Sequence, residues 1–114
     1  MENIHDINKV IAKLETTNNN NGDYFLDFLQ TKSINAGVLI LKPKQKDTQG
    51  PHSLDEIYYI IKGEGCIQIG EKVHPFQSGM CIFVPSNTPH RFFDNNSQLV
   101  VLYFFFRQVD IRTN

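Results

Sequence analysis

The chain has 114 residues, enough for one domain that buries about two-thirds of its unfolded surface without disulfides or a structural metal. With 40% hydrophobic and 20% charged residues, the composition is that of a globular protein rather than a disordered or fibrous one. The net charge of -1 argues against the basic surface on which nucleic-acid binding depends.

The ends and the cysteines of the chain indicate a cytoplasmic protein. The N-terminal residues lack the basic region and apolar core of a signal peptide, and the longest apolar run, Leu99 to Phe106, is too short to span a membrane. Two cysteines, Cys66 and Cys81, fit a reducing compartment, and we expect both to be buried as small hydrophobic residues. We therefore expect no membrane partner and no nucleic-acid partner.

Residues 3–16 are predicted to form an amphipathic helix. Apolar side chains recur there at helical spacing, at Ile4, Ile7, Ile11 and Leu14. The asparagine run at 18–21 and Gly22 have the composition of a loop, which ends the helix. We assign this helix and loop to residues 1–23 and the main domain to residues 24–114, and we expect His5 on the helix to face solvent.

From Tyr24 onward the pattern is that of an antiparallel β-sandwich or barrel. Short runs rich in β-branched and aromatic residues alternate with turn residues. The runs cover residues 24–30, 36–42, 56–62, 66–70, 80–85, 90–93 and 98–106.

The last run predicts a strand that is covered on both faces. Residues 99–106 are apolar at every position, whereas a strand with one solvated face alternates apolar with polar residues. One face can fill the barrel. The other needs a cover, and we expect a homodimer to provide it, the alternative being the N-terminal helix alone.

Three residues stand out as metal ligands, namely His52, Glu56 and His90. In a straight strand His52 and Glu56 would be about 13 Å apart, too far to share one ion. A turn at residues 53–55 would make them cross-strand neighbours, with His52 ending one strand and Glu56 opening the next. His90 would arrive from a later strand.

The segments around these residues resemble the two motifs of the cupin family. The first motif is a glycine, a His-x-His pair, a glutamate three or four residues on, and a glycine after six more; here His52 fits the second histidine, and Glu56 and Gly63 are correctly spaced. The second motif is matched in spacing by Gly79, Pro85 and His90. The resemblance covers about residues 34–106 and implies a small antiparallel β-barrel of the jelly-roll type.

The chain departs from both motifs. Gly50 occupies the position of the first histidine, Asn87 replaces the second glycine of the second motif, and Asp94 stands where that motif has asparagine. The remaining two histidines and one carboxylate still form a ligand set for one divalent ion, of the type found in non-haem Fe(II) oxygenases, and Mn, Zn, Ni or Co also fit it. Gln49 is a weaker oxygen donor nearby.

Strand alternation predicts the surroundings of this site. If Glu56 and His90 point inward, then Tyr58, Ile60 and Phe92 also point inward and form an apolar, aromatic pocket for a small molecule, in which Tyr58 offers a hydroxyl for catalysis. The alternative for Ile60 and Phe92 is that they only fill a narrow barrel.

Two further side chains are expected at the surface. We expect His74 to be exposed and Arg91 to point outward, next to the inward-pointing His90.

Three functional classes remain open. The first is a metal-dependent enzyme acting on a small molecule, with dioxygenase-like chemistry slightly favoured over isomerase or lyase chemistry. The second is a non-catalytic module that binds a small molecule. The third is a metal-free barrel with a structural or interaction role. Family resemblance alone does not choose among them.

Overall fold

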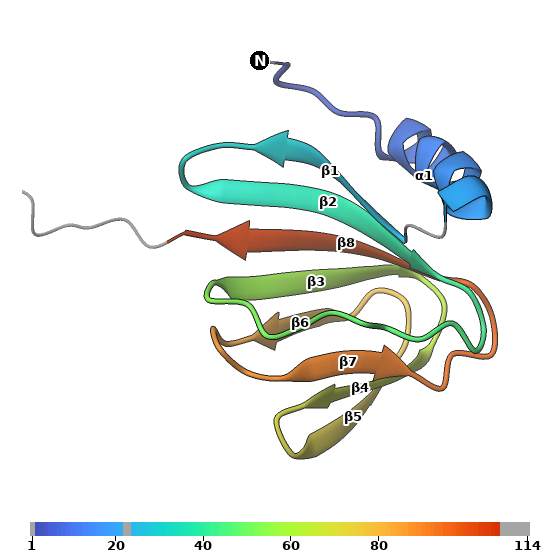
Figure 1. The fold of residues 1–114 in the computed structure, drawn as a ribbon, viewed down its shortest axis with the longest axis vertical. Coiled ribbons are helices and arrows are strands. Elements are labelled where there is room, and N and C mark those ends of the chain that lie inside the picture. The colour runs from blue at the N-terminus through green and yellow to red at the C-terminus, as the bar shows by residue number, and fades with distance from the viewer. Residues whose placement is uncertain (1, 22–23, 108–114) are drawn as a thin grey trace, which may run out of the picture.

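The computed structural model describes residues 2–21 and 24–107 as one helix followed by strands (Figure 1). The elements are α1 (Ile7–Asn21), β1 (Phe25–Gln30), β2 (Ile34–Leu41), β3 (Asp55–Lys62), β4 (Gly65–Ile69), β5 (Lys72–Phe76), β6 (Cys81–Val84), β7 (His90–Phe93) and β8 (Leu99–Phe106).

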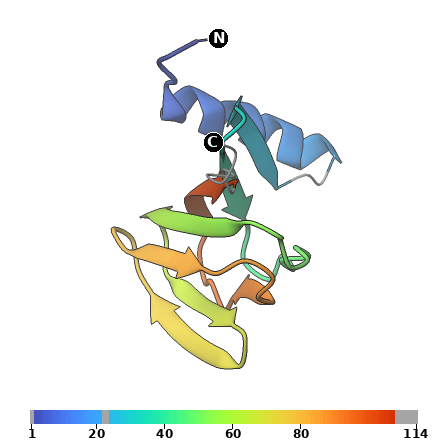
Figure 2. The same ribbon diagram turned by 90° about the vertical axis from the view of Figure 1, so that its left-hand side faces the viewer.

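The strands form two antiparallel sheets of a jelly-roll type. A five-stranded sheet has the order β1-β2-β8-β3-β6, and a three-stranded sheet has the order β5-β4-β7 (Figures 1 and 2). The chain passes between the sheets after β3, β5, β6 and β7, so strands distant in sequence become neighbours. The predicted all-β, antiparallel jelly-roll with one N-terminal helix is confirmed, although the two sheets do not close into a continuous ring.

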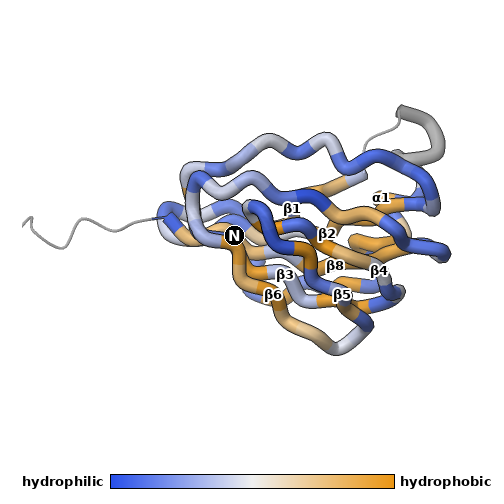
Figure 3. Tube along the Cα trace, turned by 90° about the horizontal axis from the view of Figure 1, so that it is seen from below, coloured by the Kyte–Doolittle hydropathy of each residue, from blue (hydrophilic) through white to orange (hydrophobic). Residues whose placement is uncertain are grey.

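The hydrophobic core fills the space between the two sheets. Alternate residues of each strand point into it because successive side chains of a strand lie on opposite faces. The strands carry most of the hydrophobic positions, and the loops that join them are mainly hydrophilic (Figure 3). The buried members of this core are Tyr24, Leu39, Leu41, Tyr58, Ile60, Ile67, Phe76, Val84, Phe92, Leu99, Val101 and Tyr103.

Helix α1 begins later and ends later than its apolar pattern predicts. The Oδ1 atom of Asp6 accepts hydrogen bonds from the backbone N–H groups of Asn8 and Lys9, so Asp6 is the N-cap. Ile4 therefore lies before the helix and is 88% exposed. The asparagine run predicted as a loop is helical to Asn21, because asparagine lowers helix stability only by a few tenths of a kcal/mol and does not forbid it.

The helix covers one end of the five-stranded sheet. Leu14 packs in a second buried cluster against the outer face of β2 and β8, through Val38, Ile40 and Val100. His5, expected to face solvent on the helix, instead precedes it and lies against Phe28, with 5.1 Å between ring centroids.

The other end of the same outer face is not covered by any described element. Ile57 of β3 lies between Phe83 of β6 and Phe104 of β8, while Tyr59 and Phe106 extend the patch along β3 and β8. Phe83, Tyr59 and Phe106 are exposed. The expectation that β8 is covered on both faces is thus met along only part of its length within residues 2–21 and 24–107.

Several surface expectations can be compared directly with the fold. His74 and Arg91 are exposed as expected. Cys81 is also exposed and Cys66 is half-buried, so the expectation that both cysteines are buried is wrong. Strand β5 was not predicted, because its proline and polar residues hide a short edge strand whose side chains are mostly exposed.

No described helix is long and apolar enough to cross a membrane. The predicted boundary between residues 23 and 24 falls beside residues outside the described ones and stays a prediction.

Candidate functional site

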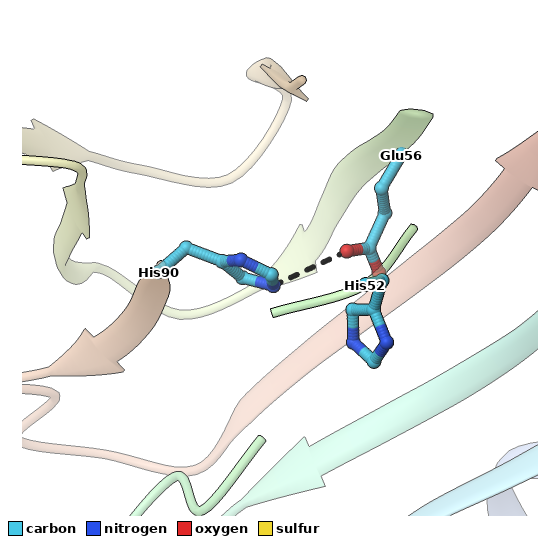
Figure 4. A group of neighbouring side chains, drawn as sticks. All are labelled: His52, Glu56 and His90. Atoms are coloured by element: carbon cyan, nitrogen blue, oxygen red, sulfur yellow. Dashed lines mark ion pairs between the residues drawn. The ribbon is translucent and has the colours of Figure 1, made fainter. Parts of the chain in front are cut away.

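Three side chains from separate parts of the chain meet at the inner face of the larger sheet. Glu56 is the second residue of β3, His90 opens β7, and His52 lies in the unpaired segment before β3 (Figure 4). One ligand atom from each lies within 4.8 Å of the others. His52 does not end a strand, as the hairpin hypothesis required; a bend at residues 53–54 brings it beside Glu56.

Four polar atoms of this cluster are buried and lack hydrogen-bond partners. These atoms are Nε2 of His52, both carboxylate oxygens of Glu56 and Nε2 of His90. The His90 and Glu56 atoms are 3.3 Å apart, within ion-pair distance, yet their orientation does not make a regular hydrogen bond. A buried carboxylate without a donor costs several kcal/mol, so the cluster is suited to a cation that satisfies all three residues.

The ring of His90 has a defined orientation. Its Nδ1 lies 2.8 Å from the carbonyl oxygen of Thr88, which accepts the Nδ1 proton and leaves Nε2 as the atom facing Glu56. Burial opposes the charged imidazolium, but the Glu56 carboxylate and the Thr88 carbonyl outweigh it, and together they raise the pKa of His90.

The position of His52 depends on β8 and on the turn before β7. The ring of Phe105 contacts the His52 ring edge to face, with 4.7 Å between centroids. The backbone N–H of Asn87 donates to the carbonyl oxygen of His52 over 2.6 Å. Asn87 has a φ of 59°, in the left-handed region, which explains why asparagine can replace the glycine that the resemblance implies there.

The three residues predicted to line a pocket all point into the core. Tyr58 and Ile60 are fully buried, and Phe92 is 2% exposed. The hydroxyl of Tyr58 donates to Oε1 of Gln49 over 3.4 Å, and burial, reinforced by Glu56, raises the pKa of Tyr58 well above its ordinary value. Tyr58 is therefore a neutral phenol near neutral pH. The assignment of these three residues to a substrate pocket stays a prediction.

Asp47, which the sequence did not single out, ties the segment before His52 to both sheets. Its carboxylate accepts hydrogen bonds from the Tyr24 hydroxyl, from the side-chain amide of Gln49 and from the backbone N–H of Phe92. Asp47 is half-buried, and no local sequence motif marks it. Asp47 therefore positions Gln49, and through Gln49 the hydroxyl of Tyr58.

A cavity of about 290 Å³ opens beside His52, on the side of β1, β2 and β8. The sequence does not predict this cavity, because its lining comes from residues far apart in the chain. The lining residues are Tyr24, Phe25, Asp27, Asn35, Leu39, Thr48, Gln49, His52, Tyr103 and Phe105. Strand alternation alone could have indicated Tyr103 and Phe105, which share the inner face of β8.

Residues 37–106 match the family model described as the Cupin domain. An uncharacterized protein of Streptomyces coelicolor is 29% identical over 95 residues, which cover 83% of this chain and 90% of that protein.

Solved structures show the same fold at low sequence identity. A Thermus thermophilus protein superposes with a TM-score of 0.75 and 21% identity, over 95% of this chain and 100% of that one. A Photorhabdus luminescens protein superposes with a TM-score of 0.70 and 16% identity, over 95% of this chain and 90% of that one.

Proposed function

Since the chain belongs to the cupin family, we propose that it holds one divalent metal ion through His52, Glu56 and His90 and acts on a small molecule bound beside that ion. The observation that carries the proposal is the group of buried, unpartnered ligand atoms converging on one point. Two ligands on opposite sides of one ion are about 4.2 Å apart, so the observed spread needs only small side-chain adjustments.

The donor set favours a particular chemistry. Two imidazoles and one carboxylate leave open positions on the ion, which suits Fe(II) and dioxygen chemistry, while Mn, Zn, Ni and Co also bind such ligands. A bound ion would polarise a coordinated oxygen of the substrate. Tyr58 is proposed to donate a proton or orient the substrate, with Ile60 and Phe92 as apolar walls. The alternative function is small-molecule binding without catalysis.

The test is metal content, measured by plasma mass spectrometry on untagged protein reconstituted with Fe, Mn, Zn, Ni or Co. We expect about one equivalent of at least one ion. The isosteric variant Glu56→Gln should lose it, because the carboxylate charge is removed while the shape is kept. Glu64→Gln, at an exposed glutamate, is the matched control.

Two outcomes would contradict the proposal: no ion retained by the wild-type protein, or full retention by Glu56→Gln with an unchanged circular dichroism spectrum. Oxygen uptake on the loaded protein with small-molecule substrates then separates the enzyme from the non-catalytic binder.

We also propose that the protein is cytoplasmic and forms a homodimer. The two free cysteines suit a reducing compartment. For the dimer, the support is the outer patch formed by Ile57, Tyr59, Phe83, Phe104 and Phe106. Apolar faces of this kind mark interaction sites. A second copy of the chain, related by a two-fold axis, would place its own patch against this one.

The dimer proposal predicts that Phe83→Asp yields a monomer. A charge on the β6 side of the patch must be desolvated on association, whereas Phe83 is 56% exposed in the single chain and tolerates the change. Sedimentation equilibrium should give twice the chain mass for the wild type and the chain mass for the variant. Val73→Asp, at another exposed apolar residue on β5, should remain dimeric. A wild-type protein of monomer mass would refute the proposal.

A further inference from the structure

We infer that the cavity beside His52 contains a second recognition point, formed by Asp27 and supported by Tyr103, that selects small molecules carrying a protonated amine. This inference rests on the proposed function, because it assigns to the ligand one end at the metal site and the other at Asp27. Both His52 and Asp27 line the same cavity.

The recognition point is built across three strands. Asp27 of β1 lies opposite Gly37 of β2, which lies opposite Tyr103 of β8. The hydroxyl of Tyr103 donates a hydrogen bond to Oδ1 of Asp27. Because Gly37 has no side chain, the Tyr103 ring can cross the backbone of β2 and reach a carboxylate two strands away.

This row lies directly beside the proposed metal site. In the next row of the same sheet face, Glu56 is opposite Phe105, which is opposite Asn35. Tyr58 continues the row of Tyr103 on β3. A ligand between the two rows therefore contacts the metal-facing residues at one end and the Asp27 carboxylate at the other.

The charges of the lining favour a cation at the Asp27 end. Among the lining residues that the structure describes, Asp27 is the one aspartate, and there is no glutamate, lysine or arginine. Arg107 is not one of the lining residues, and its Nη1 donates to Oδ1 of Asn35 and to the Thr31 carbonyl oxygen. An anionic tail at this end would thus meet the Asp27 carboxylate and no cationic side chain of the described lining.

The Asp27 carboxylate has the capacity for an ammonium group. It accepts one hydrogen bond from Tyr103 and one from the Gln30 side chain, out of about four acceptor positions. The rings of Tyr24, Phe25 and Tyr103 line the same cavity, and aromatic faces attract cations. Burial and the Asp27 carboxylate raise the pKa of Tyr103, so its hydroxyl remains a donor.

The size of the cavity limits the ligand. At about 290 Å³ it is at the lower end of the range for small-molecule sites, which suits a single ring with a short substituent. The ligand class is therefore a compact aromatic or cyclic amine with a metal-binding head.

The experiment compares three catechols that share one chelating head and differ in the tail: dopamine, catechol and 3,4-dihydroxyphenylacetate. Binding is measured by calorimetry on the Zn-loaded protein, since zinc does not oxidise catechols. We expect dopamine to bind about fivefold or more tightly than catechol, and the anionic compound to bind weakest. Asp27→Asn should abolish the preference for dopamine and leave catechol binding within about twofold.

The control is Asp94→Asn, which makes the same charge change at an exposed residue outside this cavity and should keep the preference. Equal binding of the three catechols, or a preference that survives in Asp27→Asn, would overturn the inference while leaving the metal proposal intact.

If the protein retains no metal, the metal proposal fails by itself and the amine site is tested separately. The metal-free protein should then still bind 2-phenylethylamine in preference to phenylacetate, and Asp27→Asn should remove that preference. Equal binding of these two probes would overturn the inference.

Discussion

Replacing Gly37 with alanine is expected to lower the free energy of unfolding by about 2–4 kcal/mol. A Cβ at this position would lie 2.2 Å from the Tyr103 hydroxyl oxygen and 2.6 Å from the backbone carbonyl oxygen of Leu26. The second contact is with a paired strand, so the chain cannot relieve it by rotating a side chain. Tyr103 would also have to leave its position and lose its hydrogen bond to Asp27.

The matched control for this prediction is Gly50→Ala. A Cβ there meets no heavy atom within 4 Å, and Gly50 does not adopt the left-handed backbone conformation. Its free energy of unfolding should stay within about 0.5 kcal/mol of the wild type. Urea denaturation followed by circular dichroism measures both variants. Equal stabilities of the two variants would show that the sheet yields at Gly37 and that the Tyr103 contact is not rigid.

The fold and the three clustered residues could be predicted from the sequence because both depend on short-range patterns. Alternating apolar strands separated by turn residues indicate an antiparallel β-fold. The spacing of Glu56 and Gly63, and of Gly79 and His90, then indicates which strands bring His52, Glu56 and His90 together. Their roles as metal ligands stay a prediction until metal content is measured.

The helix boundaries depended on a local interaction that the apolar pattern does not contain. Capping by Asp6 starts α1 after Ile4, whose apolar side chain suggested an earlier start. Strand β5 was missed because Pro75 and its polar neighbours suit an exposed edge, which hydrophobic alternation cannot detect.

The sequence could not show which residues meet in the cavity, because their contacts depend on how the strands pair. Tyr103 is hydrogen-bonded to Asp27, 76 positions away, and the register of β1, β2 and β8 decides that the two meet. Asp47, beside this cavity, is hydrogen-bonded to Tyr24 and Phe92, which are 23 and 45 positions away. Gly37 looks like an ordinary glycine in a strand until that register is known. Strand alternation could have indicated that Tyr103 points inward, but not that its partner is Asp27.

We expect substitutions at residues 50 and 52 to change the metal affinity in opposite directions. Protein sites with four ligands bind zinc with about 10–16 kcal/mol, or about 3 kcal/mol per ligand. His52→Ala should therefore weaken binding about 100-fold. Gly50→His should strengthen it about tenfold, a smaller change because a new histidine must lose side-chain freedom on binding. Competition with a chromophoric chelator measures all three proteins.

A histidine at residue 50 has both the position and the space to reach the ion. In an extended segment, residues two apart project to the same side, so a histidine at 50 projects with that of His52. The absence of any heavy atom within 4 Å of a Cβ there leaves room for the ring. Gly50→Ala, which adds no ligand, should bind metal like the wild type.

The same variant tests whether the missing histidine serves ligand binding. A fourth protein ligand fills a coordination position that a chelating molecule would otherwise take. Gly50→His should therefore bind metal more tightly and catechol more weakly than the wild type. If both affinities rise, or if metal binding is unchanged, residue 50 does not face the ion and the open position is set by other residues. A rise in metal affinity with a fall in catechol affinity would mean that glycine at residue 50 weakens metal binding but keeps a coordination position open for the small molecule.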